Sequence, residues 1–146
     1  MPLFTSGNPF ANGVLTTLAG CDYKAADGNA VKIINAAGTW PTLTGTPWLV
    51  GYRGNQPIPA PVPVGTLESL VVPQFPNPLL GPIAGTIAVA SGANQEVDFD
   101  LPALATSVTP CPTATDLYCF AVFCQLANGD IVPLQTGTWN ALGVGS

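Results

Sequence analysis

The sequence contains no histidine, and only three of its 146 residues are basic. Catalysis that uses imidazole as acid or base is therefore excluded, as are metal sites with histidine ligands. Binding to nucleic acid requires several Lys or Arg side chains that displace phosphate counterions. A chain with three cations and a net charge of −5 does not supply them, so we expect no nucleic-acid partner.

Charged residues of both signs make up only 8% of the chain, whereas they make up about a quarter of an average domain. Long solvated helices and coiled coils need many Glu and Lys residues on their outer faces, so they are excluded. The length suits a single domain spanning residues 1–146. With so few charges, uncharged polar and apolar side chains must cover its surface. Such a surface favours contact with other proteins, and the alternative is a neutral secreted monomer.

Long apolar runs and helical patterns are also missing. No stretch of 18 or more apolar residues is present, so we expect no membrane-spanning helix and no membrane partner. The first ten residues contain no basic residue and no continuous apolar core, and they do not resemble a signal peptide. The best short helix candidate is Leu101 to Ser107, where Pro102 suits a first helical turn.

Short apolar, β-branched and aromatic runs bounded by turn residues recur instead. They predict an all-β fold, either a sandwich or a jelly-roll-like arrangement of antiparallel Greek-key sheets. The expected strands cover residues 14–18, 30–36, 48–52, 67–72, 85–90, 95–101, 117–126 and 131–134.

Two of these strands carry the most information about packing. The run 117–126 is apolar on both faces, which predicts a central strand packed on both sides. Asn128-Gly129 follows it and predicts a hairpin to the strand that starts at Ile131. Pro133 favours an edge position for this return strand, because proline cannot donate to a ladder.

The segment 95–101 alternates between apolar and polar side chains, which predicts a half-buried strand. Its apolar face consists of Val97, Phe99 and Leu101. The opposite face carries an acidic ladder, defined as Glu96, Asp98 and Asp100. Carboxylates about 7 Å apart suit a Ca²⁺ site completed by a loop, or an acid–base pair acting on a glycan. We expect the third alternative, a solvated strand face that prevents edge aggregation.

No other pattern in the sequence supports chemistry. The serines lie in no nucleophile motif, and no phosphate-binding glycine motif is present. We therefore expect a protein that is not an enzyme, without catalytic residues, metal or cofactor. The Trp and Tyr residues suit a carbohydrate-stacking platform, or more commonly core and interface anchors. They are Trp40, Trp48, Trp139, Tyr23, Tyr52 and Tyr118.

Four cysteines allow two disulfides in three connectivities: Cys21, Cys111, Cys119 and Cys124. They lack the CxxC spacing of zinc sites. Cys119 and Cys124 lie five residues apart in a predicted strand, so they face opposite sides and do not pair with each other. Cys111 is then the better partner for one of them, and the alternative is four buried free thiols.

Two segments lack strand periodicity and predict extended arms. The first is residues 1–12, and the second is a proline-rich excursion at residues 55–82 with X-Pro repeats at 57–63 and 73–78. Such arms can lie across a neighbouring subunit, bind an aromatic groove, or pack on their own domain. We assign the following residues to an interface: Phe4, Phe10, Pro57, Ile58, Pro59, Pro61, Val62, Pro63 and Phe75.

A small β domain with few charges and arms at 1–12 and 57–78 resembles the capsid decoration (cement) proteins of tailed bacteriophages. The resemblance lies in size and character over the whole chain. It implies a non-enzymatic structural protein on the outer capsid surface of a virion. It also implies a homo-oligomer, with a trimer favoured, that binds the major capsid protein and stabilises the shell. Phe4, Phe10 and residues 57–63 would then contact capsid or sister subunits.

Two other classes remain as alternatives. An extracellular binding module, either secreted or surface-displayed, such as an adhesin or a carbohydrate binder, predicts formed disulfides and a monomer. An enzyme that uses the acidic ladder predicts loss of activity when Asp98 and Asp100 become Asn. A capsid protein of the small RNA-phage type is excluded, because the basic surface that would face RNA is missing.

Overall fold

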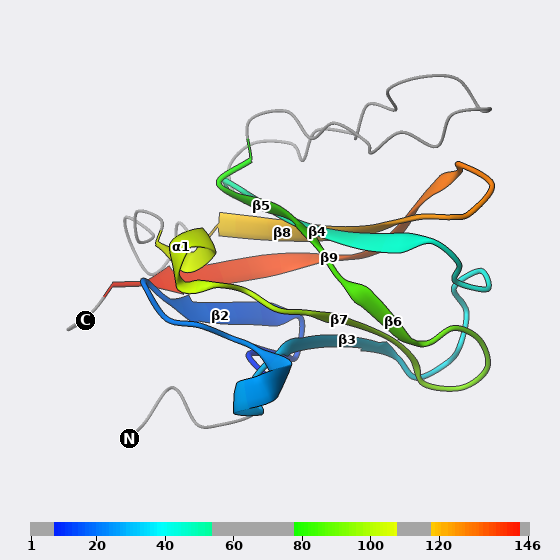
Figure 1. The fold of residues 1–146 in the computed structure, drawn as a ribbon, viewed down its shortest axis with the longest axis horizontal. Helices are drawn as coiled ribbons and strands as arrows, with labels where there is room; N and C mark the ends of the chain where they lie inside the picture. Colours follow the sequence, from blue (N-terminus) through cyan, green and yellow to red (C-terminus); the bar gives the residue numbers. More distant parts are fainter. Residues whose placement is uncertain (1–7, 54–77, 108–117, 144–146) are drawn as a thin grey trace.

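The computed structural model describes residues 8–53, 78–107 and 118–143. These residues form two β-sheets, a short 3-10 turn (η1) and one short helix, arranged as two layers (Figure 1). In chain order the elements are β1 (Phe10–Ala11), β2 (Val14–Leu18), η1 (Ala25–Asp27), β3 (Val31–Asn35), β4 (Thr46–Tyr52), β5 (Leu80–Ala84), β6 (Thr86–Val89), β7 (Gln95–Phe99), α1 (Ala103–Thr106), β8 (Tyr118–Gln125) and β9 (Ile131–Leu142). The predicted all-β sandwich is confirmed.

The larger sheet has the order β1-β2-β9-β8-β4-β5, and the smaller has the order β3-β7-β6. All neighbouring strands are antiparallel except β2 and β9, which run parallel. The prediction of purely antiparallel sheets is wrong for this pair. Two parallel neighbours need a long connection between them. Here the connection is the whole stretch of chain between β2 and β9.

The connection from β7 in the smaller sheet to β8 in the larger sheet carries α1.

The main core lies between the two sheets. The inward face of β7 extends through Leu101 as predicted, and Val97, Phe99 and Leu101 are all buried. From the larger sheet, Trp139 and Phe120 are the largest fully buried side chains. The alternation of apolar and polar residues along 95–101 therefore predicted correctly which face of this strand lies in the core.

Strand β8 is central, as predicted, and a hairpin joins it to β9. The hairpin turn is closed by Gly129 N–H donating to Leu126 C=O at 2.9 Å, and Gly129 has a left-handed φ of 94°. The predicted edge position of the return strand is wrong, because β9 lies between β8 and β2. However, β2 pairs with β9 only from Thr138 onward, so no described strand lies beside Pro133 on its side away from β8.

The arms are described only in part. Residues 10–11 of the first arm form β1, and the proline-rich excursion ends earlier than predicted because β5 begins at Leu80. Pro82 fits there because β5 is the edge strand of its sheet. Phe4, Phe75, the repeat 57–63 and the predicted strand 67–72 lie outside the described residues.

Candidate functional site

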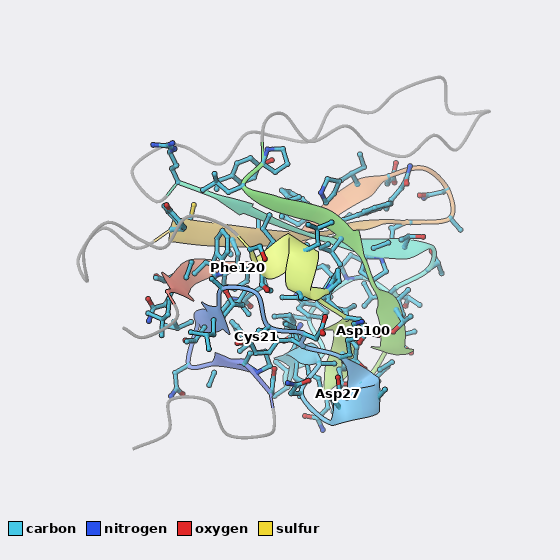
Figure 2. The ribbon with its side chains drawn as sticks, turned by 60° about the vertical axis from the view of Figure 1, so that its left-hand side comes forward. Cys21, Asp27, Asp100 and Phe120 are labelled. Carbon is cyan, nitrogen blue, oxygen red and sulfur yellow. The ribbon has the colours of Figure 1, made fainter. Side chains whose placement is uncertain are left out.

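The acidic ladder divides into a pair and a separate residue. Glu96 and Asp98 share the outer face of β7, and the Glu96 carboxylate acts on the Asp98 carboxyl. Asp98 lies opposite Lys32 of β3. Asp100 instead accepts a hydrogen bond from Ala25 N–H at 2.9 Å, and Figure 2 shows it beside the turn that carries Asp27. In the described part of the chain, no group of three Cys, Asp or Glu side chains is arranged to hold a metal ion.

Asp98 is the unusual member of the ladder. Burial raises the pKa of Asp98 to about 6, and the hydrogen bond and negative charge of Glu96 act in the same direction. Lys32 opposes this rise only partly. Asp98 Oδ1 is buried and has no hydrogen-bond partner among the described residues. Asp98 therefore takes up a proton at a higher pH than an ordinary aspartate does.

We expect the free energy of unfolding to rise as the pH is lowered from about 7.5 to about 4.5. Because the pKa of Asp98 is about 6 in the folded chain against an ordinary value of 3.8, the folded state binds the proton more tightly. Protonation therefore favours folding between these two values, and ionised Asp98 lowers stability above them. Urea unfolding at a series of pH values measures the effect.

The neutral variant Asp98→Asn should be more stable than the wild type at high pH and should lose most of the rise. Asp27→Asn, on the exposed η1 turn, is the matched control and should keep the rise. A flat wild-type profile, or an undiminished rise in Asp98→Asn, would show that the carboxyl pair does not control this pH dependence.

A second apolar cluster lies on the face of the larger sheet that points away from the main core. We define this outer apolar face as Trp48, Val50 and Tyr52 of β4 with Cys119, Ala121 and Phe123 of β8. Val50 and Ala121 are fully buried, and Tyr52 is 5% exposed. Outward positions of a sandwich sheet are usually polar. The larger sheet is therefore apolar on both faces along β4 and β8.

Two polar groups accompany the outer apolar face. The Tyr52 hydroxyl is buried without a hydrogen-bond partner among the described residues. Burial raises the pKa of Tyr52, and the neighbouring Cys119 adds to the rise. The Cys119 thiol lies 3.6 Å from Arg53 C=O, and burial raises its pKa as well. The thiol is therefore held protonated and is a weak nucleophile.

The structure separates the aromatic residues that suggested a carbohydrate platform. Trp139 and Tyr23 are buried in the main core, and Tyr118 stacks on Trp139 with ring centroids 5.4 Å apart. Trp48 and Tyr52 lie on the opposite side of the sheet. These residues consequently do not form one stacking surface. For most of them, the alternative role as core anchors is the one that the structure shows.

The predicted orientation of the cysteines is confirmed. Cys124 lies in the main core and Cys119 on the outer apolar face, so the sheet separates their side chains. Cys21, Cys119 and Cys124 are free thiols, and Cys111 lies outside the described residues.

Of the predicted interface residues, the structure describes Phe10 alone. Its ring packs edge-on against Phe120, labelled in Figure 2, with centroids 5.5 Å apart. Asn8 anchors the chain just before it, because its side chain donates to Lys32 C=O and accepts from Lys32 N–H. This end of the first arm thus packs on its own domain.

The one α-helix among the described residues has four residues, and no helix in that part of the chain could cross a bilayer. No protein-family model matches the sequence, and neither a curated protein nor a solved structure shows significant similarity to the chain.

Proposed function

We propose that this chain is a non-enzymatic structural protein of a viral particle, a decoration protein on the outer surface of a tailed-bacteriophage capsid. The observation that carries the proposal is the low charge of the chain, of which only 8% of residues are charged. Uncharged polar and apolar side chains must then cover the surface, and such a surface favours contact with other protein chains.

The remaining surface also supports a role in an assembly. With charges at only 8% of positions, copies of the chain repel one another weakly. On the smaller sheet, Ile34 and Val89 are 48% and 37% exposed and both lie opposite Glu96. Exposed apolar side chains grouped in this way are typical of protein contacts. The proposed partners are sister subunits, with a trimer favoured, and the major capsid protein.

The alternative is a secreted or surface-displayed binding module. It is favoured by the arrangement of two packed sheets, because many cell-surface domains are β-sandwiches. That argument is an analogy at the level of the fold. A binding module would be a monomer in solution, which separates it from the first proposal.

Light scattering on a size-exclusion column should give a trimer or larger species for the full chain. Deleting residues 1–7, which include Phe4, should weaken this species if the arm reaches a neighbour. The deletion stops before Asn8 and Phe10, so it leaves their contacts with Lys32 and Phe120 in place. Phe10→Ala is the matched control, because it removes the contact with Phe120 but should leave the mass unchanged.

A monomer that is indifferent to the deletion would contradict the assembly proposal and favour the binding module. Screening the monomer against a glycan array, read by quenching of Trp fluorescence, would then be the next step.

A further inference from the structure

Strand β3 forms an edge of the smaller sheet and lacks the features that protect the other described edges (Figure 1). Edge strands are commonly very short, or carry a proline or a β-bulge, because their unpaired N–H and C=O groups would otherwise bind another strand. Strand β1 has two residues, β5 contains Pro82, and β6 has a bulge between Ile87 and Val89. Strand β3 has five residues in regular register with β7 and contains no proline. Its outer edge therefore needs another form of protection.

The side chain of Asn8 provides this protection at one position. Asn8 Nδ2 donates to Lys32 C=O at 2.8 Å, and Asn8 Oδ1 accepts from Lys32 N–H at 2.9 Å. One side-chain amide thus makes both of the hydrogen bonds that a neighbouring strand would make with Lys32. Because both main-chain groups of Lys32 bind Asn8, they point away from β7, toward the outer edge. Asn8 therefore closes the edge at Lys32.

Ile34 is the next residue whose main chain points toward the outer edge, because such residues alternate along an antiparallel strand. Among the described residues, none is hydrogen-bonded to the N–H or the C=O of Ile34. The side chain of Ile34 is 48% exposed. In the described part of the chain, the edge thus offers a donor, an acceptor and an apolar side chain beside the position that Asn8 occupies.

The edge of β3 is complementary to itself. If two copies pair antiparallel about Ile33, Lys32 of each copy lies opposite Ile34 of the other. Residues placed opposite each other in this way exchange both of their main-chain hydrogen bonds. The aliphatic stem of Lys32 then covers the exposed side chain of Ile34 in the other copy. A second copy of β3 therefore satisfies the same groups that Asn8 and solvent satisfy in the single chain.

Charge favours the same arrangement. Glu96 lies opposite Ile34 in the smaller sheet. The pairing therefore brings the Lys32 ammonium group of one copy toward the Glu96 carboxylate of the other. The one ion pair among the described residues joins Lys24 to Asp22, so neither Lys32 nor Glu96 is in an ion pair there. A two-fold axis forms the contact between Lys32 and Glu96 twice.

We propose that the outer edge of β3 is a strand-pairing site for the same edge of a second copy, and that Asn8 holds this site closed. Release of the Asn8 side chain from Lys32 opens the edge, and the smaller sheets of two copies then join into one continuous sheet. The inference goes beyond the proposed function, because Asn8 closes the edge in a virion protein and in a secreted monomer alike.

Asn8→Ala in the full chain tests the proposal, because it removes both hydrogen bonds to Lys32. Light scattering should give at least twice the mass of the wild type at the same concentration. Amide hydrogen exchange should become faster at Lys32 in dilute protein, where the edge is open. It should become slower at Ile34 in concentrated protein, where the second copy protects this amide.

Asn128→Ala is the matched control. Asn128 is also an exposed asparagine, and its side chain is hydrogen-bonded to Asp130 within the turn between β8 and β9. This variant should keep the mass of the wild type and its exchange rates at Lys32 and Ile34.

Three results would overturn the proposal. Wild-type mass in Asn8→Ala, together with faster exchange at Lys32, would show that the opened edge binds no second copy. A larger mass without protection of Ile34 would show that the copies meet elsewhere. Unchanged exchange at Lys32 would show that Asn8 does not close the edge. The mass of the wild type remains the separate test of the assembly proposal, so the two proposals can fail independently.

Lys32→Pro, added to Asn8→Ala, provides a second test. Proline removes the N–H that points toward the outer edge but removes no hydrogen bond to β7, so β3 should keep its place in the sheet. The double variant should return to the mass of the wild type. A mass that remains as large as that of Asn8→Ala would contradict pairing through this edge.

Discussion

Replacing Trp139 with Ala should lower the free energy of unfolding by about 3–5 kcal/mol. Trp139 is fully buried in the main core, and its indole N–H donates to the Thr17 hydroxyl at 2.9 Å. The substitution removes the largest fully buried side chain among the described residues and leaves a cavity between the sheets. Domains typically have a free energy of unfolding of about 5–15 kcal/mol, so little stability should remain in the variant at room temperature. Urea unfolding followed by far-UV circular dichroism measures the loss.

Two further substitutions separate the contributions at this position. Thr17→Val removes the hydrogen-bond acceptor but keeps the ring, so it should cost only about 1–2 kcal/mol. Gly51→Ala places a Cβ 2.7 Å from the Trp139 ring and 2.9 Å from Leu80 Cβ, so it should be destabilising by overpacking.

In the Trp139→Ala background, the added methyl group of Gly51→Ala should cost less, because the ring is gone. Equal costs in the two backgrounds would show that the ring does not limit the space at Gly51. A loss below about 1 kcal/mol for Trp139→Ala would contradict its place at the centre of the core.

Replacing Gln95 with Leu should lower the free energy of unfolding by about 2–4 kcal/mol, although the side chain keeps a similar size. Gln95 is 1% exposed at the start of β7. Its Oε1 accepts from Trp40 N–H at 3.0 Å, and its Nε2 donates to the carbonyl groups of Trp40, Pro41 and Ala90 at 3.2, 3.1 and 3.0 Å. Leucine would remove all of these hydrogen bonds, and of the three carbonyl groups only that of Ala90 keeps a further recorded main-chain donor, Leu43 N–H at 3.0 Å.

The variant Gln95→Glu tests the same contacts with a charge. It keeps the acceptor for Trp40 N–H but turns a carboxylate oxygen toward three carbonyl groups. We expect it to be destabilised at pH 7 and to recover part of the loss in acid, when the protonated carboxyl can donate again. Amide hydrogen exchange at Trp40 should accelerate in both variants. A Gln95→Leu variant as stable as the wild type would show that the hydrogen bonds of Gln95 do not hold the connection from β3 to β4.

The sequence pointed to some features of the candidate sites and missed others. The alternation from 95 to 101 located the acidic ladder and its outward face. It did not show that Asp100 caps η1 while Glu96 and Asp98 form a pair, because η1 lies far away in the sequence. Gln95 lies two residues before Val97, so both side chains point inward. This alternation was the signal in the sequence that could have shown that the Gln95 amide is buried.

The sequence indicated one of the two strands that form the outer apolar face. In the run 117–126 both sets of alternating positions are apolar, which indicated a strand packed on two faces. Its partner was less clear, because the predicted strand 48–52 is short and ends just before the proline-rich residues. Only the register of β4 on β8, with Val50 opposite Ala121 and Tyr52 opposite Cys119, assembles the face.

The sequence by itself determined the all-β class, the inward face of β7, the central position of β8 and the opposite orientations of Cys119 and Cys124. These features follow from local periodicity, because side chains alternate strictly along a strand. The tertiary structure alone decided the parallel pairing of β2 with β9 and the internal position of β9 despite Pro133. It also decided the docking of Phe10 on Phe120. Each of these depends on contacts between residues far apart in the chain, and local patterns carry no information about which distant strand or ring completes them.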